Sequence, residues 1–593
     1  MPVLFPESLR NRLSAIFEEA FEKAGAPREH AAVVVSQKPE LGDFQCNGAM
    51  PSSKALKRNP REIADAAVAA VGSHPAIAQI TIAGPGFINI RVADEFLAAG
   101  VESARVDGRL GLTAVAEPIR MIVDFGGPNV AKPMHVGHLR STIIGDALQR
   151  LFKFLGHDVL SDIHLGDWGT QMGMLIEAVK RENPLLPYFK SNYAFDHVLE
   201  PVVTIDDLQR MYPEASALCK SDPRLLAGAQ KATAELQGGH RGYRALWRHF
   251  VDVSNAGQSA DFEALGVRFD QWFGESRYDA TLTRLVDDLR ATGHVREDAG
   301  ALIIDVAEPT DKAEIPPMLL VKSDGGFLYA TTDMATIAER VGEFRARLIL
   351  YVVDKRQSLH FVQLFRAARK TGLDQGAALE HLPFGTMNGS DGTPFKTRSG
   401  GVMRLRDLID MMTTEATRRM DEGGIAAELD PVERAEIARR VGIASLKYAD
   451  LQNPRANDYI FDPEKFTRFE GRTGAYLCYA AVRIKSILRN AGEKGFQPGK
   501  IIPASLPAER ALQLQLALLP DAIASAAEAR GPHHLAGYAY DLAQVFNQFY
   551  NQCHILSEDD PARRAAWLGL VAATLRTLET VLGLLAIEAP ERM

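Results

Sequence analysis

The sequence is poor in cysteine and has no long uninterrupted apolar segment. Its 593 residues include four scattered cysteines (46, 219, 478 and 553), without the paired spacing of a zinc site or of a disulfide framework. We therefore expect no zinc site, no disulfide bridges and a cytoplasmic location. No apolar run approaches the roughly 20 residues that cross a bilayer, and the N-terminus lacks a basic stretch followed by an apolar core. We expect no membrane association.

An excess of positive charge is also missing. The chain has 75 acidic and 67 basic residues, a formal net charge of −8 at pH 7, so any contact with RNA must come from a local basic surface. The hydrophobic fraction of 46% and the charged fraction of 24% are those of an ordinary globular protein. The chain is too long for one core, so we expect three or four domains.

The stretch from Asp124 to Thr142, DFGGPNVAKPMHVGHLRST, organises the chain. The β-branched run 119–125 predicts a buried strand. Apolar residues recur every four positions from Leu139 to Leu155 and predict a helix that ends at Gly156. A second strand-like run, 157–165, completes a strand–helix–strand unit.

The tetrapeptide His135-Val-Gly-His138 lies where the first predicted strand passes into the helix. Free backbone N–H groups and the helix dipole favour phosphate at such a position. Gly137 has no Cβ, so an adenine or a sugar can approach the backbone closely. The two imidazoles can donate hydrogen bonds to phosphate oxygens in a transition state. Taken alone, the four residues are better explained as two surface histidines at a tight helix start.

The flanking residues decide between these interpretations. Nineteen residues, Pro128 to Asp146, closely resemble the first signature of the class I aminoacyl-tRNA synthetases, and specifically that of the arginyl-tRNA synthetase family. The resemblance implies ATP, L-arginine and tRNA(Arg) as substrates, Mg²⁺ bound with ATP, and arginine activation that requires bound tRNA. It implies ATP contacts at His135, Gly137, His138 and Lys396. It implies arginine contacts at Asn129, His138, the backbone of Gly127 and Pro128, and three later residues described below.

One departure from the family accompanies this match. Two family positions before Pro-Asn carry acidic or polar residues; this chain has Asp124 at one and Gly127 at the other. Because glycine has no side chain, no side-chain contact is expected at the second position.

The resemblance covers the whole chain and predicts an α/β fold: a Rossmann-like class I catalytic domain between an N-terminal α+β domain and a C-terminal all-α bundle. The predicted parts are 1–112, the N-terminal domain, which in the family touches the tRNA elbow; 113–400, the catalytic domain with a helical insertion at about 182–265; 401–450, a helical connector; and 451–593, the anticodon-binding bundle. From residues alone, the N-terminal part is better explained as an ordinary packing domain. It has predicted helices at 8–25 and 61–71, a loop at 38–47 and a strand through 77–90.

Two further strand-to-helix junctions carry candidate residues. Asp167 lies in a glycine-rich turn, where it either receives a ribose hydroxyl or an amine, or belongs to a capped helix with a buried Trp168. Tyr329 and Asp333 lie four apart; if a helix begins near Tyr329, both project to one side. A buried Asp333 at the carboxyl edge of a parallel sheet suits the donor fork of a guanidinium. The alternative is a capping or ion-paired Asp333; resemblance to the family's amino-acid pocket favours the guanidinium and adds Gln357.

A glycine-rich stretch, 388–401, occupies the place of the second class I signature, Lys-Met-Ser-Lys-Ser. Its Phe-Lys-Thr-Arg-Ser keeps Lys396 and has Ser399 instead of the other lysine. Alone it would be a solvated basic loop. The missing positive charge must come from Lys132, as the resemblance suggests, or from Arg398. The predicted catalytic residues around the phosphates are thus His135, His138, Lys132 and Lys396.

Beyond about residue 405 the pattern is helical. On a helical wheel that starts at Arg468, one stripe within about 80° contains Arg468, Arg472, Tyr476, Tyr479 and Arg483. Arginines interleaved with tyrosines suit stacking on single-stranded bases, so we predict a tRNA contact here. The alternative is a half-buried stripe with tyrosine rings in the core. We expect a monomer.

Two rival functions remain open from sequence alone. One is a class I synthetase of another specificity, or a small nucleotidyltransferase that shares the histidine signature. The long C-terminal bundle disfavours the transferase, and Asp333 with Tyr329 favours a cationic amino acid. The other rival is a catalytically silent RNA-binding paralogue, against which the presence of His135 and His138 argues.

Overall fold

The computed structural model describes residues 8–323, 325–395 and 402–593. Lys396, Arg398 and Ser399 of the second signature lie outside the described residues.

The N-terminal part is an antiparallel sheet with strand order β1-β2-β4-β3, packed against helices, as the α+β prediction requires. Its elements are α1 (Leu9–Lys23), β1 (Val33–Val35), β2 (Phe44–Cys46), α2 (Ala49–Leu56), α3 (Pro60–Val71), β3 (Ile77–Ala83), β4 (Phe87–Val92) and α4 (Asp94–Val106). Two local predictions were wrong. The expected loop 38–47 contains β2, and the single strand expected over 77–90 is a β3–β4 hairpin. The hairpin turns at Gly84 and Gly86, whose φ angles are +53° and +139°.

The centre of the molecule is a five-stranded parallel sheet with strand order β12-β11-β5-β6-β7. Its strands are β5 (Arg120–Asp124), β6 (Asp158–Leu165), β7 (Gln271–Gly274), β11 (Leu348–Tyr351) and β12 (Ala378–His381). Because every pair is parallel, all five carboxyl ends meet at one edge. The predicted strand–helix–strand unit is confirmed, and so is the Rossmann-like α/β class.

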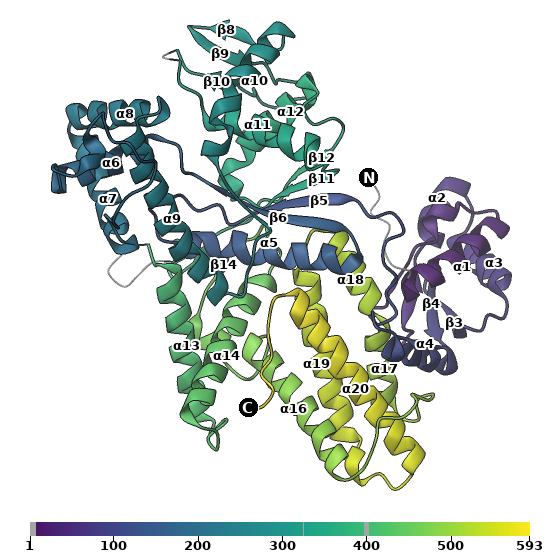
Figure 1. Cartoon of the computed structure of the whole chain (residues 1–593). Helices are drawn as coiled ribbons and strands as arrows, with labels where there is room; N and C mark the ends of the chain where they lie inside the picture. Colours follow the sequence, from purple (N-terminus) through teal and green to yellow (C-terminus); the bar gives the residue numbers. More distant parts are fainter. Residues whose placement is uncertain (1–7, 324, 396–401) are drawn as a thin grey trace.

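Helices cover both faces of this sheet (Figure 1). Helix α5 (Val136–Leu155) lies on one face, and α11 (Tyr329–Gly342) and α12 (Ser358–Thr371) lie on the other. The alternation along β5 explains this: Met121 and Val123 join the core of α5, whereas Ile122 joins the core of α11 and α12. Gly145 permits the close approach of α5, since a Cβ there would lie 2.2 Å from the Phe125 ring.

Two excursions interrupt the parallel sheet. The predicted insertion is helical and contains α7 (Ile205–Ser221), α8 (Pro223–Gln237) and α9 (Arg241–Ala264), next to α6 (Thr170–Glu182). Helix α10 (Asp279–Ala291) then leads to a small antiparallel sheet of β8 (Arg296–Asp298), β9 (Ala301–Ile304) and β10 (Met318–Val321). Helix α11 therefore follows an antiparallel strand, although its N-terminal end still reaches the carboxyl edge of the parallel sheet.

The remainder of the chain is almost entirely helical, as predicted. It contains β13 (Met387–Asn388), α13 (Leu405–Glu422), α14 (Pro431–Leu451), β14 (Tyr459–Ile460), α15 (Pro463–Phe466), α16 (Gly474–Glu493), α17 (Pro507–Ala517), α18 (Leu519–Glu528), α19 (His533–Gln552) and α20 (Pro561–Leu584). By length and composition α20 could cross a membrane, which the sequence analysis did not anticipate. However, 67% of its most apolar 18-residue stretch is buried within the structure, as in the core helix of a bundle.

Helix α5 also rests on this bundle. The Arg140 Nε donates to Asp450 Oδ2 on α14 at 2.8 Å, and both side chains are almost fully buried. Another Arg140 nitrogen donates to the carbonyl of Asn457 at 2.8 Å. Nearby, β14 forms a parallel pair with β13, so the chain returns from α14 to the catalytic part.

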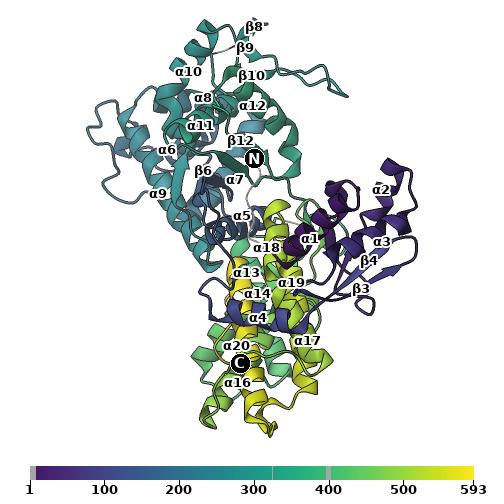
Figure 2. The same cartoon turned by 90° about the vertical axis from the view of Figure 1, so that its right-hand side faces the viewer.

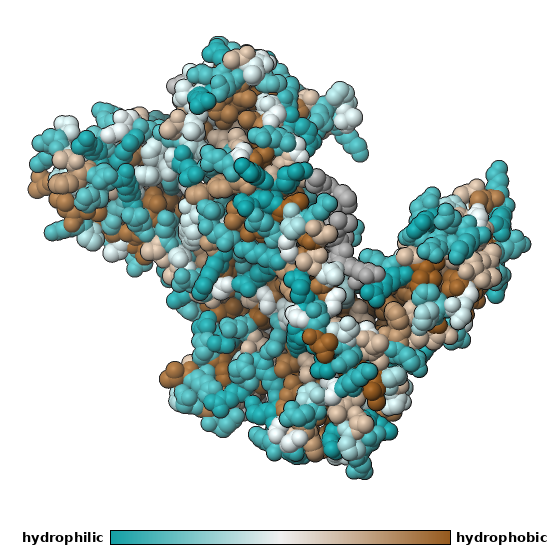
Figure 3. Space-filling model, turned by 45° about the vertical axis from the view of Figure 1, so that its right-hand side comes forward, coloured by the Kyte–Doolittle hydropathy of each residue, from teal (hydrophilic) through white to brown (hydrophobic). Residues whose placement is uncertain are grey.

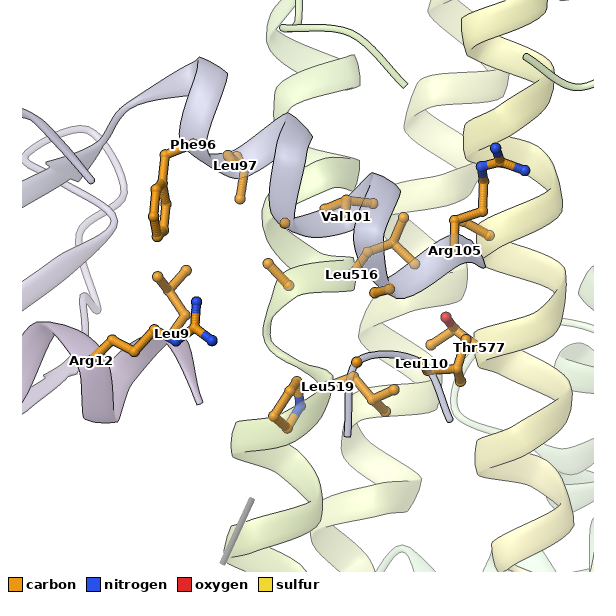
Figure 4. Close-up of a pocket in the computed structure, with 16 residues that line it drawn as sticks. Leu9, Arg12, Phe96, Leu97, Val101, Arg105, Leu110, Leu516, Leu519 and Thr577 are labelled. Atoms are coloured by element: carbon orange, nitrogen blue, oxygen red, sulfur yellow. The ribbon is translucent and has the colours of Figure 1, made fainter. Parts of the chain in front are cut away.

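The N-terminal lobe is fastened to the side of the bundle (Figure 2). The guanidinium of Arg510 on α17 donates to both oxygens of Asp43 at 2.8 Å, to Asp94 at 2.6 Å and to the Val92 carbonyl at 2.9 Å. In the space-filling view the lobe stands away from the catalytic part across a wide notch (Figure 3). A mostly apolar pocket remains in the joint, where α1 and α4 face the bundle (Figure 4).

Candidate active site

The start of α5 is a double cap built from the two signature histidines. His135 is the N-cap residue, and its Nδ1 accepts from the Gly137 N–H at 3.0 Å. The His138 Nδ1 accepts in turn from the His135 N–H at 3.1 Å, which completes a capping box. Because each Nδ1 accepts a backbone proton, the neutral imidazoles carry their hydrogen on Nε2. Both rings therefore have an Nε2–H available for a ligand.

Electrostatics keep both imidazoles neutral. Burial, followed by the charge of His135 and partly by Lys132, lowers the pKa of His138 to about 3. Burial and the nearby Lys132 and Arg356 lower the pKa of His135. The ring centroids are 4.0 Å apart, so two charged rings would repel each other strongly. At neutral pH the pair is a set of hydrogen-bond donors without its own positive charge.

The histidine cap requires a glycine at position 137. A Cβ at this position would lie 2.8 Å from the His135 ring, so a larger residue would displace the imidazole. Gly137 therefore shapes the cap in addition to leaving the predicted space for a nucleotide. Lys132 lies near the same helix start, and its Nζ is 4.9 Å from the centroid of the Tyr212 ring on α7. This lysine adds positive charge beside the histidine pair.

A second group of side chains gathers at the start of α11. The helix begins at Tyr329, so the predicted spacing is confirmed, and Tyr329 and Asp333 are one turn apart. The prediction of a buried Asp333 was wrong in part, because its side chain is 30% exposed. Tyr329 is 57% exposed. Asp333 Oδ2 lies 2.7 Å from His360 Nε2 on α12. Asp333 does not act as the helix cap.

A further carboxylate, Glu275, faces Asp333 from the end of β7. Burial is the main cause that raises the pKa of Glu275 to about 7, and the charges of Asp333 and Asp167 add to it. Glu275 was not among the residues predicted from the sequence. The signal was available: Glu275 directly follows a strand of the parallel sheet, at the same carboxyl edge as the other candidates.

Asp167 has an internal partner. Its two oxygens accept from the backbone N–H of Ser276 at 2.9 Å and from its hydroxyl at 2.6 Å. It does not cap α6, whose N-cap is Gly169. A Cβ at Gly274 would lie 2.4 Å from the Asp167 carboxylate, so this glycine makes room for it. Trp168 is half-buried and donates to Asp279 at 2.8 Å. Asp167 thus ties the end of β6 to the segment that carries Glu275.

Asp124 is also engaged inside the protein. Its Oδ2 accepts from Arg340 at 2.6 Å, and Arg340 also donates to Asp162 at 2.7 Å. The two carboxylates raise the pKa of the buried Arg340 guanidinium well above its ordinary value. Arg340 lies over the Tyr351 ring, 5.4 Å from its centroid. This buried cluster supports the floor of the site.

The remaining predicted contacts surround the same edge. Asn129 forms a bridge with Gly166 at the end of β6, where a Cβ on the glycine would lie 2.2 Å from Asn129 Oδ1. Gly127 is exposed and Pro128 is buried. Gln357 is exposed and ends the short turn before α12. Helices α5 and α11 thus cover opposite faces of the sheet. Across its carboxyl edge, the charge of Arg356, just before α12, acts on His135 at the start of α5.

The C-terminal stripe differs in part from the sequence prediction. Helix α16 begins at Gly474 with Thr473 as its cap, so Arg468 and Arg472 precede the helix and the wheel that placed them on it was wrong. Tyr476 is buried and its hydroxyl accepts from Asn547 at 2.6 Å, as the core alternative proposed.

A surface hollow nonetheless forms beside α16. Tyr479 and Arg483 line it together with Phe469 and Asn547, and the Arg483 guanidinium lies 4.9 Å from the centre of the Tyr479 ring. Separately, Arg472 lies 5.0 Å from the centre of the Tyr540 ring.

Within the described ranges, no group of three or more His, Cys, Asp or Glu residues is arranged to hold a metal ion.

A parallel nucleotide-binding sheet with a two-histidine helix start and a helical bundle behind it defines a class I aminoacyl-tRNA synthetase. The model of the family described as "tRNA synthetases class I (R), catalytic domain" matches residues 100–463, well over half of the chain. The "Arginyl tRNA synthetase N terminal domain" matches residues 8–92, and the "DALR anticodon binding domain" matches residues 477–593. The chain belongs to the arginyl-tRNA synthetase family.

Individual relatives are similar to this chain over their full lengths. The arginine–tRNA ligase of Maricaulis maris is 50% identical over 587 residues, 99% of this chain and 100% of the relative. The ligase of Alkaliphilus oremlandii is 47% identical over 589 residues, with the same coverage. The solved arginyl-tRNA synthetase of Thermus thermophilus has a TM-score of 0.79 at 25% identity, over 99% of this chain and 100% of the other. The chain is an arginine–tRNA ligase, which uses ATP and binds arginine and tRNA(Arg).

Proposed function

We propose that the carboxyl edge of the parallel sheet holds ATP at the start of α5 and arginine between α11 and β7. The observation that supports this proposal is that two neutral imidazoles, each with an Nε2–H available, lie at the same sheet edge as the neighbouring carboxylates of Asp333 and Glu275. Neutral donors suit phosphate oxygens, and opposed carboxylates suit a guanidinium.

The reaction needs positioning and charge stabilisation and no covalent intermediate on the enzyme. The arginine carboxylate attacks the α-phosphate of ATP in line, and arginyl-adenylate forms as diphosphate leaves. The terminal adenosine of tRNA(Arg) then receives the arginyl group, and AMP leaves. His135 and His138 donate from Nε2 to the phosphates, and Lys132 and Lys396 supply positive charge. Mg²⁺ enters bound to ATP. Lys132 is preferred to Arg398 as the substitute for the missing loop lysine, because its charge already acts on both histidines.

Arginine is held at both of its ends. The guanidinium lies between Asp333 and Glu275, with Tyr329 beside it. The amino and carboxylate groups contact Asn129, Gln357, His138 and the backbone of Gly127 and Pro128. Arginine activation then requires bound tRNA, as the family resemblance implied.

The tRNA contacts two separate parts of the chain. Around the anticodon, Tyr479 and Arg483 line a hollow that suits a stacked base, and Arg468 and Arg472 are exposed nearby for phosphates. At the elbow, the N-terminal lobe offers a groove lined by Val34, Val35, Leu41 and Phe87, with the amide of Gln45 in it.

The domain limits follow from the same assignment: 1–112, 113–400, 401–450 and 451–593. We infer that the enzyme works as a monomer in the cytoplasm and needs no zinc.

One substitution tests the assignment of the pocket. Asp333→Asn should raise the KM for arginine by at least about tenfold and leave the KM for ATP within about twofold, because a charged hydrogen bond is lost at one substrate only. Equal losses for both substrates would overturn the assignment. Pyrophosphate exchange without tRNA tests the tRNA requirement, and a full rate there would refute it.

A further inference from the structure

The contact between His360 and Asp333 leaves the aspartate with one oxygen for a ligand. His360 lies in the first turn of α12, and its side chain is only 11% exposed. Its Nε2 is 2.7 Å from Asp333 Oδ2. No residue that the structure describes donates to Asp333 Oδ1. With its hydrogen on Nε2, the imidazole donates to one carboxylate oxygen and leaves the other available to a ligand.

The imidazole ring is itself held in place by aromatic neighbours. The centroid of the Tyr329 ring is 4.8 Å from that of His360, at an interplanar angle of 58°. The centroid of the Phe361 ring is 5.3 Å from that of His360, at an interplanar angle of 64°. The ring therefore has little freedom to turn, and Nε2 stays directed at Asp333. This contact also links the N-terminal ends of α11 and α12.

We propose that His360 is a positioning residue that sets guanidinium recognition by fixing the carboxylate plane of Asp333. This inference rests on the proposed role of Asp333 in arginine binding. A guanidinium presents five N–H donors in a rigid planar fork, so its binding depends on carboxylate orientation. Pinning Oδ2 presents Oδ1 toward the pocket that Glu275 also faces, and one guanidinium can then bridge the two carboxylates. Without the hydrogen bond from His360, the Asp333 carboxylate can rotate about its Cβ–Cγ bond.

Two substitutions separate the hydrogen bond from the packing. His360→Phe keeps a ring against Tyr329 but has no donor, whereas His360→Gln has no ring but places an amide N–H as many bonds from Cα as the imidazole Nε2. We expect the phenylalanine variant to raise the KM for arginine about tenfold, the typical effect of one lost hydrogen bond. The glutamine variant should restore it to within about threefold of the native value.

The matched measurements exclude a general effect on folding. The KM for ATP, kcat at saturating arginine and the midpoint of thermal unfolding should change little in both variants. The inhibition constant of agmatine, which has the guanidinium but no carboxylate, should rise with the KM for arginine. His381→Gln is the control, because His381 stacks on Phe361 at 4.4 Å and bonds the Val353 carbonyl rather than Asp333. It should leave the KM for arginine unchanged.

Each outcome has one meaning. If the His360→Phe variant keeps the native KM for arginine and the His360→Gln variant does not, His360 acts by packing and the inference fails. If His360→Phe has no effect while Asp333→Asn raises the KM for arginine, the inference fails and the proposed pocket stands. If Asp333→Asn has no effect on arginine, the proposed pocket itself fails. In the Asp333→Asn background, His360→Phe should add no more than about twofold, since the carboxylate that it orients is gone.

Discussion

The KM for arginine of the native enzyme should rise below about pH 7, and Glu275→Gln should abolish this pH dependence. Burial and the charges of Asp333 and Asp167 raise the pKa of the Glu275 carboxyl to about 7. A guanidinium favours the ionised carboxylate. Arginine that binds below this pH must therefore displace a proton, and the glutamine variant has none to displace.

The size of the effect follows from this pKa. With one group that must be ionised, the KM for arginine should rise about tenfold per pH unit below about 7, so the value at pH 6 should be about tenfold that at pH 8. The same shift affects stability. The folded-state pKa lies above the unfolded value of 4.5, so the folded protein binds more protons and loses stability as pH rises from about 4.5 to about 7. Glu275→Gln should recover roughly 2–3 kcal/mol at pH 8 and much less at pH 5.

The assay is tRNA charging with arginine varied at saturating ATP and tRNA between pH 6 and pH 8, with the KM for ATP as the internal control. Calorimetry in buffers of different ionisation enthalpy measures the released proton directly. His360→Gln is tested in parallel, because the His360 imidazole contacts Asp333 directly. A KM for arginine that stays constant over the range, or a Glu275→Gln variant with the native slope, would refute the reasoning.

Three further substitutions test the framework around the site. Gly100 is a helix-interior residue that lines the pocket between lobe and bundle with nothing within 4 Å of its missing Cβ. Gly100→Ala should therefore raise the free energy of unfolding, measured with denaturant, by about 0.5–1 kcal/mol. A lower free energy of unfolding would show that the pocket has no room for the added methyl group. Asp450→Asn should destabilise by about 3–5 kcal/mol, because it strands the buried charge of Arg140; an unchanged unfolding midpoint would contradict this. Arg510→Ala should raise the KM for tRNA about tenfold without changing the KM for arginine or ATP. Arg510→Lys should not rescue it, since one ammonium nitrogen cannot replace the bonds that the three guanidinium nitrogens make to Asp43, Asp94 and Val92. A native KM for tRNA would show that the lobe needs no such fastening.

Local periodicity predicted the parts of the fold that local physics determines. The four-residue repeat from Leu139 gave α5 to within three residues of its start, and Gly156 adopts the left-handed conformation, φ +98°, that ends it. The spacing of Tyr329 and Asp333 likewise placed both on the first turn of α11. These features depend on neighbours within one or two helical turns.

Contacts between distant segments were not predictable in this way. Asp167 is bound by Ser276, 109 residues later, and Asp124 by Arg340, 216 residues later. Neither pairing leaves a periodic signal. The wheel from Arg468 failed for a local reason, since Thr473 caps a helix that starts only at Gly474. Threonine is a good N-cap residue, so this error was avoidable.

The two-residue ladder between β13 and β14 has a consequence for dissection of the enzyme. The nucleotide-binding fold is closed by chain that comes after α14, because Asn388 pairs with Ile460 and Arg140 on α5 bonds the Asn457 carbonyl. A fragment that stops at the end of α14 would expose an unpaired backbone edge just before the second-signature loop and leave part of a buried guanidinium unsatisfied. An autonomous catalytic fragment must therefore extend past residue 460, well beyond the end of α14 at Leu451.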